Sequence, residues 1–247
     1  MLSIKDICKR FNDVIVFEGF TLTLLKGQVT SIVGPSGSGK STLLNLIAGI
    51  DVPDAGCIEY SETVKTTIGY MMQEPHLLPW RTLRHNALLG LEIQRRFGRA
   101  QNKDVDEYFS SFDLAGSEEL LPEQASAGMR QRVALVRTLL LQPSLLLLDE
   151  PFSNLDFDIK LRVQRRLGRY AHERECTVLL VTHDIDDAVS LSNRVIVLSE
   201  KPTSMKADIN IDLGLERSDP IAAKQSPQFG QYFGQIWSEL RYLDESD

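Results

Sequence analysis

The amino-acid sequence predicts an α/β fold with a mostly parallel sheet, an N-terminal antiparallel β subdomain and an inserted helical subdomain. Three observations support this prediction. Short continuous apolar runs end abruptly in glycine or polar residues, helical patterns separate these runs, and a long middle segment contains no strand-like run. Continuous apolar runs are typical of strands that are buried on both faces, as in a parallel sheet covered by helices.

The predicted strands follow the chain from its N-terminus. Residues 1–26 alternate loosely between apolar and polar side chains, which predicts a small antiparallel sheet. Continuous apolar runs predict strands of the main sheet at 29–33, 67–72, 145–148 and 177–181. Each of these runs ends directly before polar or glycine residues. Because ligands of parallel α/β sheets bind beyond the carboxyl ends of the strands, we expect the four polar endings to face one crevice.

Patterns typical of helices cover residues 40–49, 129–142, 155–173 and 229–240. In the second of these helices, the apolar stripe starts at Met129 and ends at Leu140, while Arg132 lies elsewhere. The last helix has almost no Lys or Arg, so we expect it to pack on its own domain rather than on a membrane.

We predict a single domain over residues 1–247. The catalytic core comprises 1–73 and 139–200, the helical subdomain comprises 74–138, and the C-terminal extension comprises 201–247. The chain is 43% hydrophobic and 25% charged, which permits a sizeable core. Its formal net charge of −7 argues against nucleic acid as a partner. No apolar run approaches the roughly 20 residues of a membrane-spanning helix, so we expect a soluble protein.

GPSGSGKS, residues 34–41, matches the phosphate-loop pattern G-x-x-x-x-G-K-[ST] at every fixed position, between a predicted strand and a predicted helix. Backbone N–H groups at the helix N-terminus can surround phosphate oxygens, and Lys40 adds a positive charge. A plain glycine turn would not require the Lys-Ser pair. The sequence therefore predicts a P-loop NTPase core. The predicted nucleotide-binding residues are Gly34, Pro35, Ser36, Gly37, Ser38, Gly39, Lys40, Ser41 and Thr42.

LLLLDE, residues 145–150, places two carboxylates at the end of a predicted buried strand. Asp149 could hold Mg²⁺, and Glu150 could orient or deprotonate an attacking water. Two adjacent carboxylates would be costly to desolvate without a cation, whereas an exposed acidic turn would carry no such cost. Gln73 and His183 also follow predicted strands. A lone glutamine or histidine is more often a satisfied polar residue, but these two are expected at the same crevice as the phosphate loop.

The phosphate loop, Gln73, ASAGMRQR, LLLLDEPFSNLD and VTHD follow one another in this order. Together they resemble the nucleotide-binding subunit of ABC transporters, over residues 1–200. Within that family, MMQEPHLLPW, residues 71–80, is most similar to the ATPases of nitrate, sulfonate and taurine importers. The resemblance implies a single ABC ATPase domain with ATP and Mg²⁺ as its ligands. It would hydrolyse ATP to ADP and phosphate and so drive import of a small solute, such as nitrate, a sulfonate or a taurine-like compound.

The resemblance also implies a role for each matched position. The catalytic residues would be Glu150, His183 and Gln73. The metal ligands would be Ser41, Gln73 and Asp149. Phe11 lies where an aromatic ring stacks on adenine in this family, although a core aromatic would fit the pattern equally well. Three further residues would act across a dimer interface, on the nucleotide of the opposite subunit: Ser126, Gly128 and Asp156.

The signature segment of this chain departs from the family pattern, because it has ASAGM where LSGGQ or LSGGM is usual. Ala125 removes a large apolar side chain, and Ala127 replaces a glycine. If position 127 needs a positive φ or a very close approach to phosphate, its Cβ costs about 1–2 kcal/mol. If the backbone there is helical, alanine is harmless or stabilising. Our hypothesis is a signature that is slowed but active, so that Ala127→Gly would raise turnover. Ser126 also suits the N-cap position of a helix.

The implied partners are transmembrane permease subunits, a second ATPase subunit in a homodimer and, indirectly, a periplasmic or extracellular solute-binding protein. The chain would then be a peripheral protein on the cytoplasmic face of the cell membrane. HLLPWRTLRHN, residues 76–86, either packs inside the helical subdomain or forms a groove for a cytoplasmic permease helix. Its position directly after Gln73 favours the groove.

Two alternatives remain open on the sequence alone. One is a soluble ABC ATPase that is not tied to transport, and the other is a weakly hydrolysing partner in a heterodimer. A P-loop kinase or GTPase is disfavoured by the glutamate of LLLLDE, the histidine of VTHD and the signature-like segment.

Overall fold

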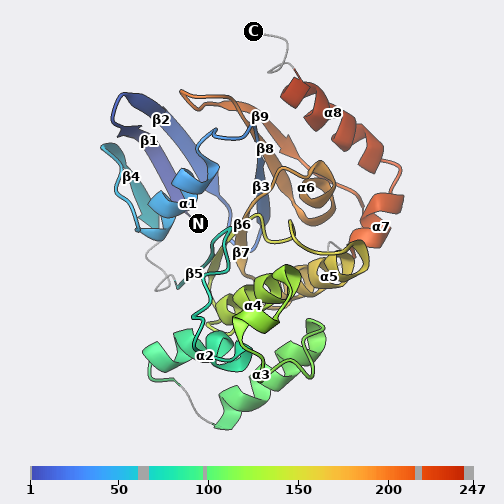
Figure 1. Cartoon of the computed structure of the whole chain (residues 1–247). Coiled ribbons are helices and arrows are strands. Elements are labelled where there is room, and N and C mark those ends of the chain that lie inside the picture. Colours follow the sequence, from blue (N-terminus) through green and yellow to red (C-terminus); the bar gives the residue numbers. More distant parts are fainter. Residues whose placement is uncertain (1, 61–66, 97–98, 215–218, 242–247) are drawn as a thin grey trace.

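The computed structural model describes residues 2–60, 67–96, 99–214 and 219–241. The main sheet consists of β3 (Val29–Val33), β5 (Ile68–Met71), β6 (Leu145–Asp149), β7 (Thr177–Val181), β8 (Arg194–Leu198) and β9 (Met205–Asn210). Its strand order is β5-β6-β7-β3-β8-β9 (Figure 1). Neighbouring strands from β5 to β8 are parallel, and β9 is antiparallel to β8. The carboxyl ends of the parallel strands therefore share one edge.

The four predicted strands of the main sheet are confirmed. Every residue of β6 and β7 is buried, as the continuous apolar runs predict. The sheet continues beyond residue 200, however, where we expected the catalytic core to end. In β9 only Ile209 is buried and every second residue is exposed, so this edge strand has no continuous apolar run that would identify it. Residues 205–210 thus belong to the core sheet and not to a C-terminal extension.

A second, antiparallel sheet contains β1 (Leu2–Phe11), β2 (Val14–Leu24) and β4 (Ala55–Tyr60), in the order β2-β1-β4. The first two strands were predicted, and β4 joins them from beyond the phosphate loop. Helix α1 (Lys40–Ala48) lies between this sheet and the main sheet, and one apolar cluster contains residues from all three (Figure 1). This shared core fixes the position of α1 and of the loop that leads into it.

The helical subdomain contains α2 (Leu83–Ile93), α3 (Arg99–Ser111) and α4 (Ala127–Leu139), at the bottom of Figure 1. One apolar cluster joins these helices to β6 and β7. Arg132 of α4, which we expected away from the apolar stripe, is buried. Its guanidinium donates hydrogen bonds to the carbonyl oxygens of Phe112 and Asp113, at 2.8 and 2.7 Å, which compensates the burial.

The C-terminal half adds α5 (Phe157–Glu173), α6 (Ile185–Leu191), α7 (Pro220–Gln225) and α8 (Phe229–Arg241). Helix α8 packs on its own domain, as its sequence predicts, with Ile236 fully buried in a cluster that includes residues of α6 and β8. Within the described ranges, no helix is long and apolar enough to cross a membrane.

Lys160 of α5 connects the beginnings of α5 and α6. Its ammonium nitrogen is 2.6 Å from a carboxylate oxygen of Asp184 and 2.6 Å from one of Asp187. Burial raises the pKa of Asp187 to about 6, although the hydrogen bond from Lys160 opposes this effect. Since α5 directly follows Asp156 and α6 begins two residues after His183, this ion-pair network fixes the helices next to two predicted site residues.

Candidate functional site

The phosphate loop connects β3 to α1 and has the conformation that its glycines allow. Gly37 and Gly39 have positive φ angles of 80° and 88°, which L side chains rarely adopt. A Cβ on Gly39 would also lie 2.6 Å from a methyl carbon of Val16, which is closer than two carbon atoms can approach. Gly39 precedes the first turn of α1, where no side chain caps the backbone N–H groups. These N–H groups are therefore available to phosphate oxygens.

Lys40 lies across this loop. Its ammonium group donates hydrogen bonds to the carbonyl oxygens of Gly34 and Pro35, at 2.8 and 2.7 Å. Burial lowers the pKa of Lys40, and the negative charges of Glu150 and Asp149 oppose that shift. The side chain thus holds the loop in its curved form and presents a positive charge at the edge of the sheet.

Asp149 ends β6 as a buried carboxylate, with only 3% of its surface exposed. Burial raises its pKa above the ordinary value, against the opposing effect of a hydrogen bond from Ser41. A carboxylate and a hydroxyl are oxygen donors of the kind that Mg²⁺ prefers. A cation at this position would also offset the cost of burying the charge of Asp149. The donor set therefore fits a magnesium ion.

Glu150 has a strained backbone, with a positive φ of 49°. A non-glycine residue in this conformation costs on the order of 1 kcal/mol, and such strain is found where the surrounding structure enforces it. Here the N–H of Glu150 donates to the carbonyl of Val181 at 2.9 Å, and its carbonyl accepts from Gln131 at 2.7 Å and from Ser153 at 3.1 Å. Its carboxylate is 2.8 Å from Nδ1 of His183. The strained backbone thus brings the carboxylate to the histidine.

Most of the predicted site residues line one cavity of about 450 Å³. It is lined by Gly34, Ser36, Gly37, Gly39, Lys40, Ser41, Thr42, Gln73, Asp149, Glu150, Ser153, His183 and Lys201. The prediction that the polar endings of four strands face one crevice is confirmed. Pro35 and Ser38 belong to the loop without lining the cavity. Ser38 is buried instead, and its carbonyl accepts a hydrogen bond from Thr203 at 2.6 Å.

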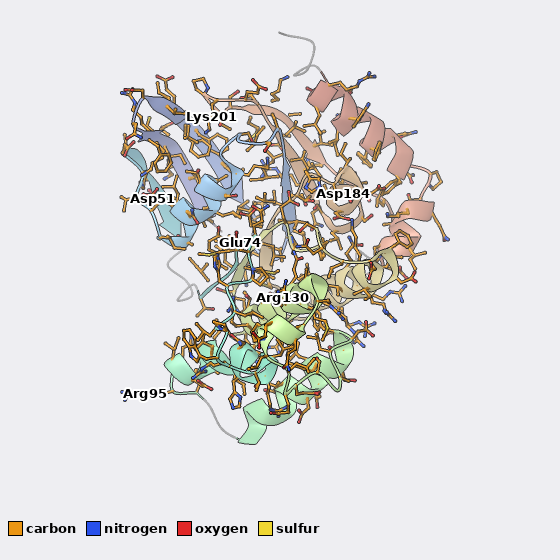
Figure 2. All side chains as sticks on the ribbon, viewed as in Figure 1. Asp51, Glu74, Arg95, Arg130, Asp184 and Lys201 are labelled. Atoms are coloured by element: carbon orange, nitrogen blue, oxygen red, sulfur yellow. The ribbon has the colours of Figure 1, made fainter. Side chains whose placement is uncertain are left out.

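Two residues of this cavity, Ser153 and Lys201, were not predicted from the sequence. Lys201 belongs to the connection between β8 and β9 and comes close to the phosphate loop because nearby Thr203 bonds to Ser38. In Figure 2, Lys201 lies towards β2 and β9, whereas Glu74, next to Gln73, lies between the main sheet and the helical subdomain. No local pattern marks a residue that only the fold brings to the site.

A larger groove of about 810 Å³ lies between α3 and α5. It is lined by acidic and arginine side chains, including Asp106, Glu107, Arg166 and Arg169, and by none of the predicted site residues. Its charges of both signs do not select one class of ligand, so its size alone does not indicate function.

Outside the phosphate loop, four predicted residues do not line the cavity: Phe11, Ser126, Gly128 and Asp156. Phe11 is 46% exposed, so its interpretation as a core aromatic is wrong. Ser126 is exposed and caps α4, because its hydroxyl accepts a hydrogen bond from the N–H of Met129 at 3.2 Å. This N-cap was predicted. Asp156 is exposed at the beginning of α5.

The conformation of the signature segment settles one alternative. Ala127 is the first residue of α4, and its φ is not positive. The alanine therefore carries no left-handed strain. Ala125 is buried and packs in the cluster of the helical subdomain. Gly128 has no room for a side chain, because a Cβ there would lie 2.8 Å from the carbonyl oxygen of Asn154.

Trp80, which the sequence placed either inside the helical subdomain or in a groove, is 73% exposed. Internal packing therefore does not account for this residue. Leu77 of the same segment is partly buried against the apolar cluster of the subdomain. The segment is thus anchored by Leu77 and leaves the indole of Trp80 on the surface.

Several known proteins are similar to this chain in sequence and in fold. Residues 17–153, more than half of the chain, match the family model described as "ABC transporter". An uncharacterized ABC transporter ATP-binding protein of Bacillus subtilis, YtlC, is 41% identical over 89% of this chain and 86% of its own length. The nitrate import ATP-binding protein NrtD of Synechocystis sp. is 34% identical over 97% of this chain and 95% of its own. An aliphatic sulfonates import ATP-binding protein of Rhodococcus jostii, SsuB 1, is 44% identical over 81% and 80%.

Among solved structures, the dimeric ATP-binding cassette MJ0796, in a post-hydrolysis state bound to ADP and Pi, superimposes with a TM-score of 0.78. It is 28% identical, and the match covers 86% of this chain and 99% of the cassette. The family model and the structural comparison therefore agree. This protein belongs to the ABC transporter family and has the fold of its ATP-binding cassettes.

Proposed function

We propose that this chain is the ATP-hydrolysing subunit of an importer that carries a small oxyanion, such as nitrate or an aliphatic sulfonate. The observation that supports this most strongly is the convergence of Lys40, Asp149, Glu150 and His183 on one cavity beside the phosphate loop. The relatives named for nitrate and aliphatic sulfonate import support the class of solute.

In this proposal, the phosphates of ATP lie on the loop, with the N–H groups of α1 and Lys40 as donors. Glu150 accepts a proton from the attacking water, while His183 orients the carboxylate and the γ-phosphate. A magnesium ion held by Ser41 and Asp149, with Gln73 nearby, would neutralise charge on the phosphate oxygens. The adenine would stack on exposed Phe11, which has the ammonium of Lys9 4.9 Å from its ring centroid.

The proposed site needs a second copy of the chain. Ser126, Gly128 and Asp156 do not line the cavity of their own chain, and the similar cassette of known structure is a dimer. We infer that Ser126 and the N-terminus of α4 face the γ-phosphate bound to the opposite copy. With Ala127 free of backbone strain, the segment ASAGM gives no conformational reason for a heterodimer.

The proposed location is the cytoplasmic face of a membrane, where the chain docks on permease subunits. Trp80 is exposed in the segment that directly follows Gln73, and this arrangement suits a surface that receives a permease helix. The solute would reach the permease through a separate solute-binding protein.

Glu150→Gln is the test of the catalytic proposal. Glutamine keeps the size of the side chain but cannot accept the proton of water. We expect ATP binding to persist while steady-state hydrolysis falls by at least about 100-fold. Glu18→Gln, an exposed carboxylate on β2, is the matched control and should hydrolyse ATP like the wild type. Normal hydrolysis by Glu150→Gln would refute the assignment.

Ala127→Gly tests whether the signature is slowed. Since position 127 is helical, glycine relieves no strain and costs up to about 1 kcal/mol of stability. We therefore expect a lower free energy of unfolding in urea and no gain in kcat. This expectation reverses the one drawn from the sequence. A clear rise in kcat would show that the Cβ of Ala127 obstructs the opposite nucleotide.

Trp80→Ala tests the docking proposal. Because Trp80 is 73% exposed, its loss should change the free energy of unfolding by less than about 0.5 kcal/mol. We expect the tagged chain to lose its association with the membranes of the cells that normally make it, measured by sedimentation. Trp237→Ala, which removes the other tryptophan, half exposed on α8, is the matched control. An unchanged membrane-bound fraction for Trp80→Ala would count against the docking surface.

A further inference from the structure

The side-chain amide of Gln131, on α4, forms hydrogen bonds to the turn that follows β6 through both its nitrogen and its oxygen. The side chain is buried, with 1% of its surface exposed. Its Nε2 donates to the carbonyl of Glu150 at 2.7 Å and lies 3.3 Å from the hydroxyl of Ser153. Its Oε1 accepts from the N–H of Asn154 at 3.2 Å. One side chain thus clamps the backbone on both sides of residues 151–153.

A second contact joins the same helix to the same turn. Gly128, three residues before Gln131, approaches the carbonyl of Asn154 so closely that a Cβ would lie 2.8 Å from it. Residues three apart lie on one face of a helix. The first turns of α4 are therefore held against residues 150–154 at two neighbouring points, one by close packing and one by hydrogen bonds.

These contacts act on a backbone that is strained. Glu150 has a φ of 49°, and its carbonyl is held by Gln131 and Ser153 while its N–H is held by Val181. The donor from Gln131 comes from the helical subdomain, and the acceptor from Val181 comes from the main sheet. Loss of the amide donor would leave the carbonyl with the weaker, longer bond from Ser153 and would let the turn relax.

We propose that Gln131 is a positioning residue that sets the carboxylate of Glu150 and couples it to the signature segment. The proposal rests on the catalytic role proposed for Glu150. Ser126 caps the helix that carries Gln131, and it would face the nucleotide of the opposite copy. When α4 moves towards that nucleotide, Gln131 moves the backbone of Glu150 in its own chain.

Gln131→Met is the first test, with ATP as the ligand and the full chain as the enzyme. Methionine fills a similar volume but has neither the donor for Glu150 nor the acceptor for Asn154. We expect kcat to fall about 10- to 100-fold, a size typical of lost orienting partners. The affinity for ATP should stay within about twofold, because the clamp does not touch the phosphate loop.

Thr138→Val is the matched control on the same helix. Thr138 is also buried, and its hydroxyl bonds to the carbonyl of Ala134 within α4, at 2.9 Å. This variant loses one buried hydrogen bond without touching the turn at 150–154. Its kcat should equal that of the wild type. An equal fall of kcat in both variants would mean that general weakening of α4, and not the clamp, slows hydrolysis, and would overturn the proposal.

Gln131→Glu adds a second readout, the pH dependence of kcat, which loss of packing alone would not change. An ionised Glu side chain keeps an acceptor for the N–H of Asn154 but has no donor for the carbonyl of Glu150. The protonated form regains that donor. The ratio of its kcat to that of the wild type should therefore rise as the pH falls, whereas the ratio for Gln131→Met should stay flat. A ratio for Gln131→Glu that is independent of pH would overturn the proposal, also where Gln131→Met fails to fold.

The positioning role of Gln131 and the catalytic role of Glu150 can be refuted separately. If Glu150→Gln is inactive and Gln131→Met has the kcat of the wild type, the positioning role is wrong and the catalytic proposal stands. If Glu150→Gln hydrolyses ATP normally, the catalytic proposal is wrong, and the positioning role falls with it.

Discussion

The site depends on the electrostatic attraction between the positive charge of Lys40 and the negative charges of Asp149 and Glu150 in a partly buried crevice. Burial disfavours the charged form of both Lys40 and Asp149, so each depends on the opposite charge nearby. The parallel sheet provides this proximity, because β3 leads into the loop of Lys40 while β6 ends at Asp149. The two strands are separated in the sheet only by β7, which leads to His183. A nucleotide and its cation would enter a crevice whose charges are already in place.

Helix α4 connects this crevice to surfaces outside it. Ser126 caps the N-terminus of the helix, and Gln131 bonds to the turn of Glu150. Arg137 donates to the carbonyls of Pro75 and His76 at 2.7 and 3.0 Å. Pro75 and His76 belong to the segment after Gln73 that also contains exposed Trp80. One helix therefore contacts the turn of the proposed base and the segment proposed to meet the permease, and its N-terminus belongs to the segment proposed to meet the second copy. Movement of α4 would therefore shift all three of these segments.

Much of this arrangement could be predicted from the sequence, because buried parallel strands are written as continuous apolar runs and the phosphate loop has a fixed pattern. Edge strand β9 could not, since alternation with exposed residues hides it. Lys201 and Ser153 reach the cavity only through tertiary contacts. The effect of Ala127 depends on its backbone φ angle, which the amino-acid sequence does not specify. Gln131 lies in the basic run MRQR, where nothing distinguishes it from a surface residue.

Two copies of this chain are proposed to complete each other's sites, and the dependence of hydrolysis on protein concentration tests this proposal most directly. The purified chain would be assayed for Mg²⁺-dependent ATP hydrolysis over a wide range of concentrations, with its mass followed by sedimentation. We expect ATPase activity per chain to rise with protein concentration and to level off as dimers form. Full activity per chain at concentrations where only monomers are present would contradict the proposal.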